Sequence, residues 1–387
     1  ENQAFTGNNE VYNVAVGFAA GNDITTGVQN TIVGGNAGDA LTTSSGITAV
    51  GYGALGASTI GNGNTAVGFE ALLISVDGDN NTAVGYRALQ DYENGDGNGE
   101  NTAVGANSQL NASTGERNTS LGSSSMGSGV TTGDFNVALG YQAGLALTSG
   151  TYNILIGGLA GDAITTAEKN IAIGHGALGT EDTHGRNIAI GDSALNILNA
   201  GAYGYNVAIG HEAGLAMTTG TMNTVVGGRA GDALTTGTYN TAFGIDALSA
   251  EDAGSGNTAI GALSLAQQDA GANAYNTAVG HKAGYAVSTG VNNTIIGGLA
   301  GDALTTGTAN TAVGYQALTT EDAHGYNTAL GYRALHTLDA GANGNNTAVG
   351  ADAGLQMTTG VQNTIIGGLA GDALTTGVSN TALGYNA

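Results

Sequence analysis

Cysteine, proline and tryptophan are absent from this 387-residue chain, and it has only five phenylalanines and 15 tyrosines. Without cysteine, the fold has no disulfide bonds and the protein performs no thiol chemistry. The lack of proline excludes a collagen triple helix, which also needs glycine at every third residue. Alanine, valine, leucine and isoleucine supply most of the 41% hydrophobic residues. A core built from them is thin, because few large rings fill it.

Basic residues are also scarce, with seven Lys and Arg against 30 Asp and Glu and a formal net charge of −23. A surface of this sign repels nucleic acid and anionic lipid, so we expect neither as a partner. No apolar run approaches the roughly 18 residues that a membrane-spanning helix needs, and we expect no membrane insertion. No signal peptide is visible and the chain begins with Glu1, which favours a processed or excised segment.

Glycine is abundant, with 70 residues, and it belongs to a repeat. A five-residue line, Asn-Thr-x-x-Gly in most copies, begins at 22 places from Asn13 to Asn380, and only Ile47 replaces the asparagine. The usual spacing between starts is 17, as from Asn293 to Asn310; from Asn153 onward the spacings 17, 17, 19 and 17 recur and give a 70-residue super-repeat. Glycine richness and high charge also favour disorder, but the regularly placed β-branched residues favour an ordered repeat structure.

We number the residues of each copy from the asparagine, which is position 0, and several positions then show a constant residue type. Position 4 is Gly in every copy, which is typical of a corner whose backbone angles other residues resist. Position 1 is Thr, Val or Ile and position 3 is apolar, a pattern that favours a short strand and disfavours helix. A unit this short cannot bury its faces alone, so the copies must stack. We therefore predict an all-β fold, a parallel β-solenoid (β-roll) of about 22 coils.

Parallel stacking places equivalent residues about 4.8 Å apart, so the asparagines predict a ladder of side-chain amides. The alternative is that Asn simply suits a turn. The predicted ladder includes Asn293, Asn310, Asn327, Asn346 and Asn363. The predicted corner glycines include Gly297, Gly314, Gly331, Gly350 and Gly367.

We expect one continuous solenoid, with a lead-in over 1–12, irregular coils over 13–152 and super-repeats over 153–387. The super-repeats are 153–222, 223–292, 293–362 and a partial copy at 363–387. Position 2 is apolar in nearly all copies, and a strand that is apolar on both faces is normally covered on both. One face can meet the coil's own core, and we expect the other to meet a second chain. The expected inter-chain contacts are the large position-2 residues Ile32, Leu155, Val225, Ile295 and Ile365.

The line NTAVGYQAL at 310–318, like NTALGYRAL at 327–335, resembles two related groups of repeats. One is the head repeat of trimeric autotransporter adhesins, a left-handed β-roll with a recurring N-S-V-A-I-G line. The other is the repeat region of phage tail-fibre proteins, which a self-cleaving chaperone domain often follows. The resemblance covers residues 13–387 and implies a β-roll that trimerises and contacts a host surface receptor. The autotransporter unit is shorter than the unit found in this sequence.

Calcium is the one ion that a motif suggests. Gly-Gly-Leu-Ala-Gly-Asp at 367–372 resembles the calcium-binding nonapeptide of parallel β-rolls, although it is offset by one residue. Its aspartates recur at most once in four coils, too far apart to share an ion, and we favour an Asp that caps a Gly turn. The calcium candidates are Asp162, Asp232, Asp302 and Asp372, with Asp39 in the irregular region. The Glu-Asp pairs at 181–182, 251–252 and 321–322 could form a weak cation site, but we expect solvated loop charge.

Other chemistry finds little support in the sequence. The glycine-rich lines lack the helix behind a phosphate-binding loop, and the six histidines are scattered rather than clustered as metal ligands are. We therefore expect no catalytic residues, no enzyme activity and no cofactor. Thr-Thr-Gly at positions 12–14 leaves ice binding as a third interpretation, because flat Thr ladders match ice, although turn chemistry explains these residues more simply.

Two hypotheses about function remain. The first is a structural protein, a subunit of a self-assembling extracellular filament whose uncapped ends stack on further copies. The second is a trimeric adhesin head or phage tail-fibre shaft whose loops contact a host receptor. Both make other copies of the chain its main partner. Both also place the protein outside the cell, on the cell surface or on a virion.

Overall fold

The computed structural model describes residues 11–92 and 98–387. Residues 1–10 of the expected lead-in lie outside this part of the chain. Contacts divide the chain into two units, Glu1–Asp192 and Ser193–Ala387. The division falls inside the coil that starts at Asn187, not at residue 153, where the super-repeat begins.

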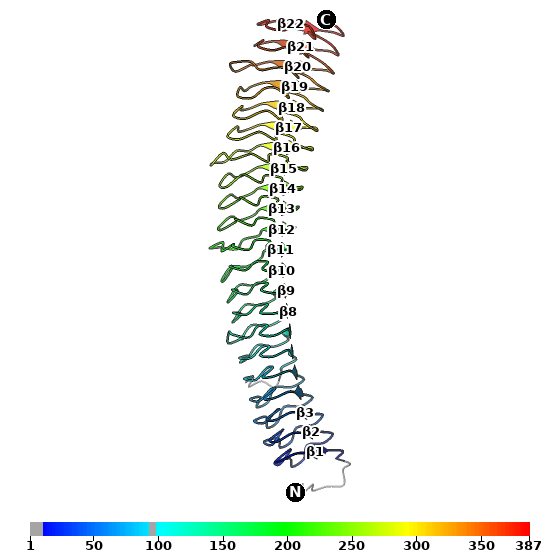
Figure 1. Ribbon diagram of the computed structural model, residues 1–387, viewed down its shortest axis with the longest axis vertical. Coiled ribbons are helices and arrows are strands. Elements are labelled where there is room, and N and C mark those ends of the chain that lie inside the picture. The colour runs from blue at the N-terminus through cyan, green and yellow to red at the C-terminus, as the bar shows by residue number, and fades with distance from the viewer. Residues whose placement is uncertain (1–10, 93–97) are drawn as a thin grey trace. The chain divides into compact units, whose positions relative to one another are not determined.

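Each coil contributes one strand of three residues (Figure 1). In the first unit the strands are β1 (Val14–Val16), β2 (Thr31–Val33), β3 (Thr48–Val50), β4 (Thr65–Val67), β5 (Thr82–Val84), β6 (Thr102–Val104), β7 (Thr119–Leu121), β8 (Val137–Leu139), β9 (Ile154–Ile156), β10 (Ile171–Ile173) and β11 (Ile188–Ile190). In the second unit they are β12 (Val207–Ile209), β13 (Thr224–Val226), β14 (Thr241–Phe243), β15 (Thr258–Ile260), β16 (Thr277–Val279), β17 (Thr294–Ile296), β18 (Thr311–Val313), β19 (Thr328–Leu330), β20 (Thr347–Val349), β21 (Thr364–Ile366) and β22 (Thr381–Leu383).

Within each unit, every strand pairs in parallel with the next strand along the chain. The register is one coil, so that Thr311 lies beside Thr328 and Ala312 beside Ala329. The described residues contain no helix. The prediction of an all-β parallel solenoid, with coils of mostly 17 residues, is confirmed.

The glycine at position 4 forms the corner that ends each strand. Its φ lies between 131° and 144° in all 22 coils, a region that side chains with a Cβ resist. A Cβ on Gly314 would also collide with the carbonyl group of Gly331 in the next coil. The corner therefore needs glycine for two reasons, its backbone angles and the close approach of its neighbour.

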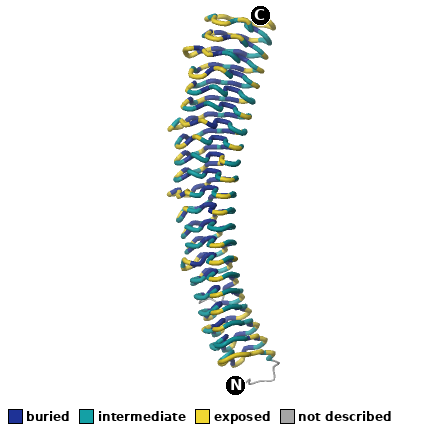
Figure 2. Tube along the Cα trace, in the orientation of Figure 1, coloured by how far each residue is buried: buried dark blue, intermediate teal, exposed yellow. Residues whose placement is uncertain are grey.

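The core lies on the side of the strand to which position 2 points. Figure 2 shows buried residues in the middle of most coils and exposed residues at their turns. The position-2 residues Ile32, Leu155, Val225, Ile295 and Ile365 are fully buried in their own chain. The prediction that they meet a second chain is therefore wrong. Because side chains alternate along a strand, it is positions 1 and 3 that point outward.

Side-chain sizes within a coil compensate for one another. In the coil that starts at Asn293, position 2 is Ile295, position 8 is Gly301 and position 11 is Leu304. A Cβ on Gly301 would lie 2.8 Å from Cδ1 of Leu304 and 3.5 Å from Cγ2 of Ile295. Other coils reverse the sizes, as in the one that starts at Ile47, where these positions hold Ala49, Leu55 and Ser58. The glycine of the GG-x-A-G-D line thus makes room for two large neighbours in the core.

The asparagines form a buried ladder. The side-chain oxygen of Asn293 accepts a hydrogen bond from the backbone nitrogen of Asn310 (2.9 Å), and that of Asn310 accepts one from Asn327 (3.0 Å). The amide nitrogen of Asn293 donates to the carbonyl oxygen of Gly307 in the return loop of its own coil (2.8 Å). Each asparagine therefore joins its own loop to the strand start of the next coil.

Among the described residues, three ladder asparagines lack part of this pattern. Asn257 and Asn327 each begin a coil of 19 residues, and their buried Nδ2 atoms have no hydrogen-bond partner. Neither therefore makes the bond to a loop carbonyl that Asn293 makes with Gly307. The Nδ2 of Asn170 also lacks a partner, although its coil is one of the shorter ones, and nothing in the structure explains it.

Candidate functional site

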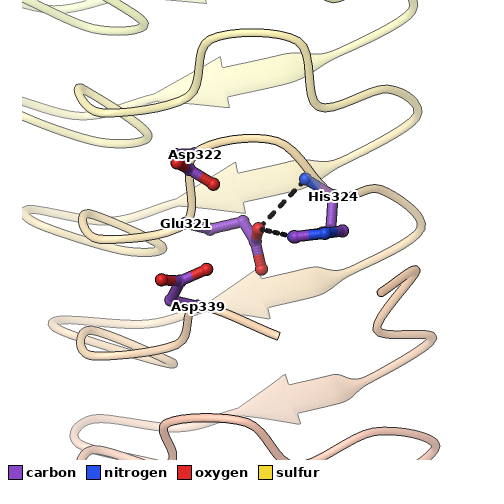
Figure 3. Close-up of side chains that lie close together, drawn as sticks. All are labelled: Glu321, Asp322, His324 and Asp339. Atoms are coloured by element: carbon purple, nitrogen blue, oxygen red, sulfur yellow. Dashed lines mark hydrogen bonds and ion pairs between the residues drawn. The ribbon is translucent and has the colours of Figure 1, made fainter. Parts of the chain in front are cut away.

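Among the described residues, a group of four potential metal ligands lies between two coils of the second unit (Figure 3). Glu321, Asp322 and His324 follow β18, and Asp339 follows β19. One oxygen or nitrogen atom from each of the four lies within 4.8 Å of the others. A divalent cation would find carboxylate and imidazole ligands here, which suits calcium less well than a transition metal.

Glu321 is the buried member of the group, with no exposed surface. Its Oε1 accepts hydrogen bonds from the backbone nitrogen and from Nδ1 of His324, both at 3.0 Å. Its Oε2 accepts one from the backbone nitrogen of Ala340 in the next coil (3.2 Å). Both carboxylate oxygens are therefore engaged by the protein, and Glu321 joins one coil to the next, much as the asparagines do.

The same arrangement recurs at intervals of 70 residues. Glu251, again fully buried, accepts a hydrogen bond from the backbone nitrogen of Gly254 (2.7 Å), and it lies with Asp252 and Asp269. In the first unit, buried Glu181 lies with Asp182 and His184. The expectation that these Glu-Asp pairs are solvated loop charge is wrong for the glutamates, which occupy position 11 of the core.

Burial determines how these carboxyl groups titrate. Desolvation raises the pKa of Glu251 and of Glu321, because a buried carboxylate loses the hydration that stabilises its charge. The backbone N–H groups of Gly254 and Ala270 partly offset this effect at Glu251, while the charges of Asp269 and Asp252 add to it. Glu251 and Glu321 therefore keep their protons to a higher pH than an ordinary surface glutamate does.

The calcium candidates do not come together. Asp162, Asp232 and Asp302 are partly buried, and desolvation raises the pKa of each. Within the described residues, neither these three nor Asp372 belongs to a group of three or more potential metal ligands. A single carboxylate per four coils is a poor calcium site, because calcium takes six to eight oxygen ligands.

Aromatic rings gather on the outside of the coils at position 5, just after the corner. Tyr52, Phe69 and Tyr86 stack in three successive coils of the first unit, with ring centroids 5.5 and 5.4 Å apart. Tyr315 and Tyr332 stack in the second unit at 5.9 Å. The sequence carries the signal for this stack, an aromatic residue at position 5 of consecutive coils.

The outward face of the strands carries two columns of side chains, from positions 1 and 3. Thr, Val and Ile fill the first column and Val, Ile, Leu and Phe the second, with no charged residue in either. Several members of the second column are exposed in the second unit, including Phe243 at 56% and Leu330 at 44%. We refer to these columns as the outer face.

Comparisons with known proteins add no family: neither a protein-family model nor a curated protein matches this chain. The resemblance to adhesin heads and tail fibres therefore depends on the repeat motif alone. Among the described residues, no helix has the length and apolarity that crossing a membrane requires.

Proposed function

We propose that this chain is a structural protein that assembles with copies of itself into an extracellular fibre. The observation that carries the proposal is the outer face. In a chain with a formal net charge of −23, most surfaces of two copies repel one another. The outer face is free of charge and partly apolar in every coil, so it is the surface on which copies can approach.

The size of the outer face supports a stable contact. Each unit has eleven strands, and every strand adds two outward side chains to the outer face, so its area grows with the number of coils in contact. A standard protein interface takes about 800 Å² from each partner. Isolated exposed apolar residues are normal, but a continuous apolar column marks an interaction surface.

A second candidate function is a trimeric adhesin head or a phage tail-fibre shaft that contacts a host surface. The motif NTAVGYQAL at 310–318 and its resemblance to those repeats favour this version. Both versions use the outer face between copies of the chain, and they differ in the size of the assembly.

Light scattering after size-exclusion chromatography, with negative-stain electron microscopy, tests both versions. A mass that grows with protein concentration and filaments in the images would support the fibre. A discrete trimer of fixed length would support the second version. A monomer at all concentrations would contradict both.

A further inference from the structure

A hollow on the first unit lies where one coil lacks two outward side chains. The coil that starts at Ile47 has glycine at positions 6 and 9, Gly53 and Gly56. Most other coils carry side chains at these positions, such as Asn36 and Asp39 in the preceding coil or Glu70 and Leu73 in the following one. Side chains from both neighbouring coils line a hollow of about 390 Å³ above the two glycines.

The distances from the glycines show that their missing side chains make this space. A Cβ on Gly53 would lie 3.6 Å from both Cγ of Glu70 and Cδ1 of Leu73. A Cβ on Gly56 would lie 3.1 Å from Cδ1 of Leu73. Any larger side chain at either position would therefore extend into the volume that the hollow now occupies.

One wall of the hollow is the ring of Tyr52, which is 53% exposed. Phe69 stacks on one side of this ring. On the other side lies Gly35, at the same position of the preceding coil, and a Cβ there would be 3.5 Å from Cδ2 of Tyr52. Because Gly35 has no side chain, it places no atom beyond its backbone against this side of the tyrosine ring.

The remaining lining offers both acceptors and donors. Asp39 is partly buried and contributes a carboxylate. Glu70 accepts hydrogen bonds from Nε of Arg87 (2.9 Å) and Nε2 of Gln90 (3.1 Å), which fix its position and balance its charge. The amide nitrogen of Asn36 lies 3.4 Å from the hydroxyl oxygen of Tyr52. Carboxylates only accept hydrogen bonds, whereas the amide also donates.

This combination matches one class of ligand. An aromatic ring packs against the C–H face of a pyranose, while carboxylates and amides bond its hydroxyl groups, each of which both donates and accepts. Anionic ligands are disfavoured by the carboxylate of Asp39 in a chain of formal net charge −23. We propose that this hollow binds a neutral saccharide through one pyranose ring. Its volume lies within the roughly 300–1,000 Å³ of small-ligand sites, and the proposal does not depend on assembly of the chain into a fibre.

Saturation-transfer NMR on the intact chain tests the proposal, with the methyl glycosides of glucose, galactose, mannose and N-acetylglucosamine as probes. We expect magnetisation transfer from the protein to the ring protons of at least one glycoside. The Gly53→Asn variant fills the hollow and should weaken binding by roughly tenfold, the value that loss of about 1.4 kcal/mol gives. Asparagine suits the backbone there, because Asn36 and Asn107 hold the same position with φ of 54°.

Gly176→Asn is the matched control, since Gly176 holds the same position in the coil that starts at Asn170 and does not line the hollow. Tyr52→Ala is a second test, as alanine already occupies this position in Ala106 and Ala351. Signal that both test variants lose and the control retains would support the site. The proposal would be overturned if no glycoside received magnetisation, or if the Gly53→Asn variant transferred as much magnetisation to a glycoside as the wild type does. Binding of only an organic cation, such as tetramethylammonium, would also overturn it.

Discussion

The backbone nitrogen of Asn310 donates a hydrogen bond of 2.9 Å to the side chain of Asn293, 17 residues earlier. The side chain of Asn310 in turn accepts from Asn327 and donates to the carbonyl oxygen of His324. One asparagine thus satisfies polar groups in two coils; Asn310 and Asn327 are buried, and His324 is partly buried. The ladder therefore contributes to stability mainly through what its removal would leave unpaired.

Asn310→Ala should lower the local stability of its own coil and of the adjoining coils. The substitution leaves the N–H of Asn327 and the carbonyl of His324 without partners, a loss of about 2–3 kcal/mol in local stability. Amide hydrogen exchange measured by mass spectrometry should show faster exchange over residues 310–330 and little change several coils away. Unchanged exchange in this segment would contradict a stabilising ladder.

Gly314→Val should be more disruptive than a change two residues later. Valine at φ 135° is strained and its Cβ would collide with Gly331, so we expect a lower midpoint of thermal unfolding. Gln316→Ala is the control, because the Gln316 side chain is partly exposed. Equal melting temperatures for the two variants would show that the corner is assigned to the wrong residue.

The compensating sizes in the core predict a rescue. Gly301→Leu alone should destabilise its coil by about 1–3 kcal/mol, because the new side chain overlaps Leu304 and Ile295. Adding Ile295→Ala and Leu304→Ser reproduces the combination of Ala49, Leu55 and Ser58. The triple variant should recover most of the loss in urea unfolding. A triple variant no more stable than the single one would refute the compensation.

Glu251 predicts a specific dependence of stability on pH. Its pKa is raised in the folded state above the ordinary value of 4.5, so the folded protein binds this proton more tightly than the unfolded chain does. The protonated Glu251 side chain therefore stabilises the folded protein fully at pH values below its pKa in the unfolded chain. This contribution to the free energy of unfolding is lost as the pH rises through its pKa in the folded protein. Glu251→Gln should therefore gain stability relative to the wild type between pH 4 and pH 7. Asp252→Asn, at an exposed neighbour, should show a smaller gain over the same range.

Charge on the outer face should prevent assembly. Phe243→Lys together with Ile296→Lys places two ammonium groups in the uncharged column, and burying them between copies is unfavourable. We expect the mass from light scattering to fall towards that of the monomer. Gln316→Lys adds one ammonium group elsewhere, at a position that Lys282 holds in another coil, and should leave the mass unchanged. An assembled double variant would exclude this face as the contact.

The repeat predicted the fold because a few positions carry strong local constraints. Glycine at position 4 and asparagine at position 0 recur along the chain, and each has one structural use that stacking explains. The inward and outward faces were assigned less well, because both are apolar. The useful signal was size: position 2 is mostly alanine, which a thin core accepts, and it is large only where position 8 is glycine.

The acidic groups and the hollow were harder to predict. Glu321 occupies a position that holds Leu304 in the preceding coil, and a buried carboxylate there becomes intelligible only with its N–H donors in view. The hollow depends on side chains from three coils that surround Gly53 and Gly56. Two glycines in one coil were visible in the sequence, but not the ring of Tyr52 and the carboxylates that enclose the space.

The ladder of asparagines has a consequence for how such a chain can change in length. Each asparagine bonds only its own loop and the adjoining coil, so inserting or deleting four coils creates one new junction and leaves every other bond unchanged. Duplication by unequal recombination is therefore tolerated in steps of one super-repeat. Residues 293–307 and 363–377, which are identical, are the kind of record that such copying leaves in a gene.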